Sequence, residues 1–196
     1  MRIFGIDPGS ERTGYGCVET DGRRHHLVAC GAISVPEGDL PHRLAHIHAA
    51  LTTLLADARP DCVAVESIFH AANARSALRL GHARGVAVLA AVQHGCPIVE
   101  YTPAEIKRAV VGYGRAEKHQ IQQMVKLLLG LDRVPSPHDA ADALAVAICH
   151  LHQARAASLT GSTLSRRGAA SAPRSWRAYR PEDLAAAPSR RRRDPA

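Results

Sequence analysis

The stretch MRIFGIDPGSERTGYGCVETDGRRHHLVACGAISV, residues 1–35, contains three apolar runs separated by two turn signals. Pro8-Gly9 follows the first run, and Asp21-Gly22 separates the second run from the third. Pro-Gly marks a chain reversal, and Asp-Gly between two apolar runs is a strong hairpin signal. The stretch therefore predicts three antiparallel strands at the N-terminus, so the fold is expected to be built on a sheet.

Helical and strand-like patterns alternate after this region. From Pro41 the apolar residues recur about every 3.6 positions, which predicts an amphipathic helix. The order of all predicted elements indicates an α/β fold: a five-stranded mixed sheet, with three antiparallel N-terminal strands plus two parallel strands, and helices on both faces. The remaining strands are CVAVE (62–66) and PIVEY (97–101). The remaining helices are one capped by Asn73 and running through Val92, one from a capping box at Thr102–Glu105, one over Lys118–Leu129 and one from Ser136-Pro137 onward.

Charge is unevenly distributed along the 196 residues. The formal net charge is +7, yet residues 1–154 hold fifteen Lys and Arg against fifteen Asp and Glu. The excess lies after residue 154, where Ala, Arg, Ser and Pro dominate and the chain ends in a run from Arg190 to Arg193. Such a composition is typical of disordered segments. We expect a globular domain over residues 1–153 and a basic, disordered tail over residues 154–196.

The cysteines and the hydropathy pattern indicate in which cellular compartment the protein is expected. The five cysteines are widely spaced and form no CxxC pair, which argues against a zinc site or a disulfide framework. No stretch reaches the roughly 18 apolar residues of a membrane helix, and the N-terminus lacks the features of a signal peptide. These patterns predict a soluble, cytoplasmic protein with buried free thiols.

Four acidic residues lie next to or within apolar runs. Asp7 ends the first predicted strand and Glu66 ends the fourth, whereas Asp139 and Asp142 are one helical turn apart in an Ala-rich helix. Carboxylates are costly to remove from water unless positive charge neutralises them. No Lys or Arg is adjacent in sequence to any of the four, so a metal ion is the natural candidate.

The expected topology brings these carboxylates together. If the first and fourth strands are parallel neighbours, Asp7 and Glu66 emerge at the carboxyl edge of the sheet, where ligand sites of α/β proteins form. Oxygen-only ligands suit Mg²⁺ or Mn²⁺. Two such ions about 4 Å apart are able to clamp the attacking and leaving oxygens of a phosphodiester displacement. The pattern thus indicates a metal site for cutting nucleic acid.

Each carboxylate also has a structural interpretation. Asp139 follows Ser136 by three residues and is able to complete a capping box. Asp7 precedes Pro-Gly and is able to form a turn, and Glu66 is able to act as a solvated strand end. Asp142 is harder to explain structurally because Ala and Leu surround it. The structural interpretations would all have to hold at once, whereas a shared site explains the four residues together.

Four segments in chain order carry a resemblance to a known family: IDPGSERTGYG, VESIFHAANARSALRLGHARGV, VVGYGRAEKHQIQQMV and HDAADALAVAICH. They resemble the successive motifs of the RuvC family of Holliday-junction resolvases over about residues 1–152. The resemblance implies an RNase H-like fold, Mg²⁺-dependent endonuclease activity in recombination and repair, with Mn²⁺ as a substitute ion, and a homodimer that nicks two strands of a four-way junction symmetrically. It implies that Asp7, Glu66, Asp139 and Asp142 are catalytic metal ligands, and that the RuvA–RuvB branch-migration complex is a partner.

The resemblance also suggests residues that contact DNA. It implies that Phe69 stacks on an unpaired base near the crossover, and that Lys107 and Lys118 contact phosphates along the DNA path. Arg75 and Arg115 are weaker candidates of the same kind, together with Arg79, Arg84 and Arg108. His138, directly before Asp139, is interpreted as a helix-start residue, with a catalytic contribution as the alternative. Ser67 stands where some relatives carry an amide side chain.

Two other classes of function are compatible with parts of the pattern. DPGSERTG resembles the first phosphate loop of actin-like sugar kinases and ATPases, but the chain offers no room for the second copy of the domain that such enzymes need. A non-catalytic junction-binding protein with the same fold is the other alternative. The full set of carboxylates argues against it, because clustered acids repel DNA and give a mere binder no benefit.

Overall fold

The computed structural model describes residues 1–67 and 73–159, and these form one mixed sheet of five strands with helices on both faces. The strand order is β3-β2-β1-β4-β5. β1 pairs antiparallel with β2, and β2 with β3, whereas β4 is parallel to both β1 and β5. The predicted fold class is therefore confirmed. The strands are β1 (Arg2–Asp7), β2 (Arg12–Thr20), β3 (His25–Ser34), β4 (Cys62–Glu66) and β5 (Ile98–Tyr101).

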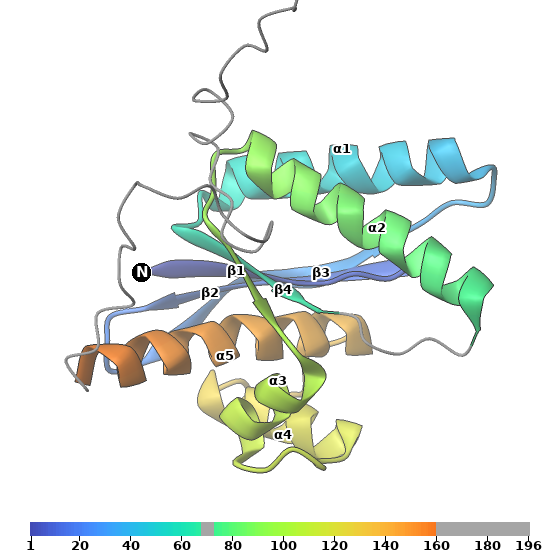
Figure 1. Ribbon diagram of the computed structural model, residues 1–196. Coiled ribbons are helices and arrows are strands. Elements are labelled where there is room, and N and C mark those ends of the chain that lie inside the picture. The colour runs from blue at the N-terminus through green and yellow to red at the C-terminus, as the bar shows by residue number, and fades with distance from the viewer. Residues whose placement is uncertain (68–72, 160–196) are drawn as a thin grey trace, which may run out of the picture.

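The helices divide between the two faces of the sheet. α1 and α2 cover one face, and α5 covers the other, with α3 and α4 packed on the outer side of α5 (Figure 1). The predicted helices are all present, and most of their ends are shifted by one or two residues. The prediction that the disordered tail begins at residue 154 is wrong, because α5 continues to Leu159. Their bounds are α1 (Leu40–Ala58), α2 (Ala74–Gln93), α3 (Pro103–Val111), α4 (Lys118–Leu128) and α5 (His138–Leu159).

Local hydrogen bonds explain where several elements begin and end. In the β2–β3 turn, the carboxylate of Asp21 accepts hydrogen bonds from the backbone N–H groups of Arg23 and Arg24 at 2.7 and 2.8 Å. Asn73 caps α2 by accepting from the Ser76 N–H, as predicted. At α3 the predicted capping box is complete, since the Thr102 and Glu105 side chains each accept from the other's backbone N–H.

Two apolar cores lie on opposite faces of the sheet. On one face Ile3 and Ala64 pack with Leu144 of α5, and on the other Phe4 and Val63 pack with Leu51 of α1. β1 is buried on both faces because it is the central strand of the five. All five cysteines are free, as expected, and no described helix is long and apolar enough to cross a membrane.

The contact between α5 and the sheet is exceptionally close because glycines replace side chains there. A Cβ atom added to Gly5 of β1 would lie 2.0 Å from the backbone oxygen of Ala143, and one added to Gly14 of β2 would lie 2.1 Å from that of Asp139. The backbone of α5 thus rests directly on the backbones of β1 and β2. This contact sets the position of the first turn of α5 relative to the end of β1.

Gly5→Ala is expected to destabilise the protein by about 1–3 kcal/mol, because the new methyl group collides with backbone that cannot rotate away. Gly114→Ala is the matched control: the nearest atom to its added Cβ lies 3.8 Å away, an ordinary van der Waals distance. Denaturant unfolding of both variants measures the difference. Equal stabilities for the two variants would contradict the close contact of α5 with β1.

Candidate active site

Asp7 and Glu66 are neighbours at the carboxyl edge of the sheet. β1 and β4 pair in parallel with Ile6 opposite Val65, so the next residue of each strand emerges at the same edge. A hydrogen bond joins the two carboxyl groups. The expectation that the first and fourth strands bring these two acids together is confirmed.

The N-terminal end of α5 supplies the other two acids. Asp139 and Asp142 are the second and fifth residues of this helix, and both are half-buried. The alternative that Asp139 completes a capping box with Ser136 is wrong: α5 begins at His138, so Pro137 flanks it, and Pro137 has no side-chain oxygen to act as a cap. Asp139 therefore sits one position too early in the helix for that role.

The four carboxylates share one electrostatic environment. The pKa of Asp7 is raised from 3.8 to about 8, first by burial and then by the negative charges of Glu66, Asp142 and Asp139. The pKa of Glu66 is raised by burial and by Asp142. Asp7 consequently keeps its proton at neutral pH, and its O–H donates a hydrogen bond to the Glu66 carboxylate. A cluster that holds a proton this tightly is a strong site for positive charge.

Lys118 neutralises one of the acids. Its Nζ lies 2.7 Å from Oδ2 of Asp142, and this ion pair raises the pKa of the lysine. The positive charges of Lys118 and of Lys107 on α3 also partly offset the rise in the pKa of Glu66. No Lys or Arg is adjacent to the four acids in sequence, yet two lysines lie near them in the folded protein. The ion pair joins Lys118, the first residue of α4, to Asp142 of α5. Local sequence patterns do not predict such a contact, because it depends on how the two helices pack.

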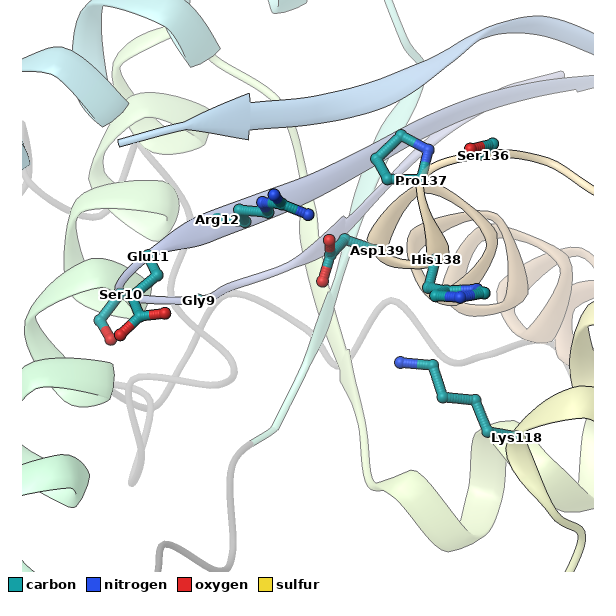
Figure 2. A pocket seen from close by; sticks show the side chains of 9 residues that line it. All are labelled: Gly9, Ser10, Glu11, Arg12, Lys118, Ser136, Pro137, His138 and Asp139. Carbon is teal, nitrogen blue, oxygen red and sulfur yellow. The ribbon is translucent and has the colours of Figure 1, made fainter. Parts of the chain in front are cut away.

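A pocket of about 670 Å³ opens beside this cluster. It lies between the loop that follows β1 and the start of α5, and the Asp139 carboxylate and the Lys118 side chain extend into it (Figure 2). Asp7, Glu66 and Asp142 are not part of its lining. The residues that line it are Gly9, Ser10, Glu11, Arg12, Lys118, Ser136, Pro137, His138 and Asp139.

The four carboxylates are suitable ligands for a hard divalent cation, although a proton and a lysine already neutralise two of them. Four carboxylates offer only oxygen ligands, which suit ions such as Mg²⁺ or Ca²⁺ rather than zinc. Among the described residues, no three Asp, Glu, His or Cys side chains are already positioned to hold an ion. Burial and the neighbouring acids raise the pKa of Asp7 so that it is protonated at neutral pH, and Lys118 forms an ion pair with Asp142. The cluster takes up positive charge in both ways.

The other predicted residues lie at varied positions. Arg75 on α2 and Arg115 before α4 are exposed, and Lys107 is half-buried near Glu66. Arg84, a weaker DNA candidate, instead forms a largely buried ion pair with Glu100. Phe69 and residues 160–196 of the predicted tail lie outside the described residues.

His138 and Ser67 flank two of the acids. His138 is exposed, and its Nδ1 lies 2.7 Å from Nε2 of Gln122 on α4, so a buried amide orients the imidazole. Ser67 is buried, and its backbone N–H donates to the carbonyl of Tyr101 at 2.8 Å, which extends the pairing of β4 with β5 past Glu66. Local patterns gave no signal for Gln122, because its role arises from the packing of α4 against α5.

A five-stranded sheet of this topology, with acids gathered at the carboxyl edge of its central strands, places the chain in the class of RNase H-like folds. Comparison with known proteins identifies the family within that class. Residues 3–150 match the family model "Crossover junction endodeoxyribonuclease RuvC". The chain belongs to the RuvC family.

Individual relatives agree with this assignment. A crossover junction endodeoxyribonuclease RuvC of Alkalilimnicola ehrlichii is 54% identical over 153 residues, covering 78% of this chain and 92% of that protein. Thermus thermophilus RuvC is 35% identical with a TM-score of 0.74, covering 80% of this chain and 96% of that one. The same protein in complex with a Holliday junction substrate aligns with a TM-score of 0.76 and 35% identity, over 83% of this chain and 97% of that one.

Family membership decides between the classes of function that the sequence suggested. It identifies an endodeoxyribonuclease rather than an actin-like sugar kinase. It also implies dependence on a divalent metal, in agreement with the oxygen-only donor set.

Asp7→Asn is expected to raise the stability of the metal-free protein. Because folding raises the pKa of Asp7 from 3.8 to about 8, the native state binds a proton that the unfolded state has released between these pH values. The stability of the wild type therefore falls as pH rises from about 4 to about 8, and the asparagine variant avoids this loss.

Denaturant unfolding in the presence of chelator measures this difference at several pH values. The stability gain of Asp7→Asn should be small near pH 4 and should grow toward pH 8. Asp57→Asn, at an exposed site on α1, is the control and should show no such growth. A gain that did not depend on pH would contradict the burial of Asp7 among other acids.

Proposed function

We propose that this protein resolves Holliday junctions by paired, symmetric nicking of two strands, as a step in homologous recombination and DNA repair. The observation that carries the proposal is the cluster of Asp7, Glu66, Asp139 and Asp142, which act on one another at the edge of the sheet in a chain of the RuvC family. Carboxylates that share a site at this edge serve phosphodiester hydrolysis when they hold metal ions.

The four carboxylates would hold Mg²⁺, with Mn²⁺ as a substitute and two ions per site. When bound, these ions supply a nucleophilic water and stabilise the leaving 3′ oxygen. Asp7 and Glu66 are fixed by paired strands and Asp139 and Asp142 by a buried helix, so the ligands are held by rigid elements. His138, oriented by Gln122 at the pocket rim, is positioned to assist in proton transfer.

Basic residues around the pocket would hold the DNA. Lys118 lines the pocket and its amino group is able to reach an incoming phosphate, while Lys107 lies near Glu66. Arg75 and Arg115 are exposed and available to phosphates farther from the scissile bond. By family resemblance, Phe69 would stack on an unpaired base at the crossover.

A homodimer fits both the substrate and the surface of α2. A four-way junction has two-fold related arms, and two copies related by a two-fold axis present two active sites to them. Beyond the first turns of α2, Leu89 is an apolar side chain that is 47% exposed. On the same helix a Cβ added to Gly81 or Gly85 would meet nothing within 4 Å, so a second helix is able to approach closely there.

The proposal extends to the rest of the chain. The nuclease domain reaches the end of α5 at Leu159, and the arginine-rich segment that follows it adds non-specific affinity for DNA. The protein acts in the cytoplasm, where chromosomal DNA is accessible in a bacterial cell, and cooperates with a RuvA–RuvB branch-migration complex.

Asp7→Asn and Asp139→Asn are each expected to lower the rate of junction nicking by more than about 100-fold while junction binding persists, because a ligand of the metal is removed but the basic surface is kept. The assay uses a synthetic four-way junction with Mg²⁺, and with Mn²⁺ or chelator in parallel. Asp57→Asn, on the exposed face of α1, should nick at the wild-type rate.

Two results of this assay would contradict the proposed function. One is a junction that stays intact with wild-type protein and either ion, which would leave a non-catalytic junction-binding protein. The other is equal nicking by the two active-site variants and the wild type, which would place the chemistry elsewhere.

Leu89→Arg is expected to shift the protein from dimer to monomer, since a charge in the centre of an apolar helix contact loses its hydration. Leu127→Arg is the matched control, because Leu127 is 70% exposed but lies on α4 rather than α2. Sedimentation analysis of both variants measures the proportions of monomer and dimer. A dimer that survives Leu89→Arg unchanged would exclude α2 as the contact.

A further inference from the structure

A second groove lies between α1 and α2, on the face of the sheet opposite α5. Its volume is about 310 Å³, and Ser10 belongs to the lining of both this groove and the pocket beside the acidic cluster. The groove and the pocket therefore meet at the loop that follows β1. None of the four acids lines the groove. Among its residues, Arg75 is the one proposed above to contact a phosphate.

The groove is positively charged. Arg43 of α1 faces Arg75 and Arg79, which are one turn apart on α2, and His82 lies one further turn along α2. No Asp or Glu is among the residues that line it. In a chain whose first 154 residues balance acids and bases, this gathering of one sign is a local property of the groove.

Two polar atoms in the groove lack partners. Nδ1 of His82 and Nε of Arg43 are buried, and neither makes a hydrogen bond within the described part of the chain. Arg43 is held in place by a hydrogen bond from its Nη2 to the backbone oxygen of Ser10. Phosphate is rich in acceptor oxygens, and the guanidinium groups of arginine are suited to bind it.

The rest of the lining is apolar. Leu40, Leu44 and Leu78 form the walls between the basic residues, and Leu78 is 63% exposed. Alternating charged and apolar contacts match a sugar–phosphate chain, in which anionic phosphates alternate with the largely apolar faces of deoxyribose. A free inorganic anion would use the arginines but leave the apolar walls uncovered.

We propose that the groove between α1 and α2 binds the phosphodiester backbone of one strand of the DNA substrate, as an accessory subsite next to the catalytic pocket. This inference rests on the proposed function and extends it. Because Ser10 borders both cavities, a strand that leaves the pocket over the β1–β2 loop enters the groove directly. Arg43, Arg75 and Arg79 then hold phosphates that are not cut.

The competing occupant is a second copy of this chain. In a two-fold symmetric contact centred on the groove, the three arginines of one copy would face the three arginines of the other. Like charges brought together in this way disfavour the contact. The charge of the groove thus favours DNA over a second copy.

The test compares the double variant Arg75→Gln/Arg79→Gln with the control Arg23→Gln/Arg24→Gln. Each pair removes two positive charges. The control residues are exposed in the β2–β3 turn, which lies at the opposite end of the sheet from Asp7 because Arg2 pairs with Glu19 there. Binding of a four-way junction is measured in chelator, so that no strand is cut, over a series of salt concentrations.

The groove variant should bind the junction about tenfold more weakly than the control at about 0.1 M salt, and the slope of log K against log salt should fall by about 0.9 for each phosphate that the variant no longer binds. Equal affinities and slopes for the two variants would overturn the proposal. So would a groove variant that changes the monomer–dimer equilibrium in sedimentation but leaves the slope of the dimer unchanged, since the groove would then be an interface between copies.

Nicking by the wild type with Mg²⁺ separates this inference from the proposed function. If the wild type nicks the junction and the two variants show equal slopes, the groove proposal fails alone. If the wild type binds without nicking but the slopes differ as expected, the groove holds DNA and the catalytic proposal fails.

Discussion

The contact between the backbone of α5 and the backbones of β1 and β2 is the constraint on which the active site depends. Gly5 and Gly14 leave no room for a side chain between helix and sheet. α5 therefore cannot slide or rise without disrupting the core that Leu144 and its neighbours form with the sheet. Since Asp139 and Asp142 occupy the first two turns of that helix, their distance from the end of β1 is set by packing rather than by the carboxylates themselves.

The carboxylates in turn oppose the fold that holds them. Burial and mutual repulsion raise the pKa of Asp7 to about 8, and the Asp142 charge is balanced by Lys118 drawn from another helix. A site of this kind stores unfavourable electrostatic free energy in the absence of metal, and a divalent cation releases it on binding. The clustered carboxylates thus lower the free energy of unfolding of the metal-free protein, and the same cluster gives the site its affinity for a cation. The rigid packing of α5 supplies the free energy that offsets this local cost.

The elements of the fold were predictable because their signals are local. Asp21-Gly22, the Asn73 cap and the Thr102–Glu105 capping box each act within a few residues, and each appears where the sequence indicates. The shared environment of the acids was predictable from parallel pairing of the first and fourth strands. Lys118 against Asp142 and Gln122 against His138 were not, because both contacts depend on how α4 docks on α5. The capping interpretation of Asp139 failed for the opposite reason: a local pattern fitted, but the helix begins at His138.

The acidic cluster repels the phosphates of the DNA that must enter the active site. The positions of the basic side chains in this fold counteract that repulsion. Bulk charge offers no solution, because residues 1–154 carry equal numbers of acidic and basic side chains. The bases are instead placed around the acids: Lys118 and Lys107 act directly on them, and three arginines line the groove across the β1–β2 loop. Coulomb attraction between exposed groups fades over about 8 Å at physiological salt, so only such nearby bases are able to hold a phosphate against the field of the cluster. The sheet edge separates the two sets, with acids on the α5 side and arginines between α1 and α2. That separation lets one strand be cut while its uncut phosphates remain bound to positive charge.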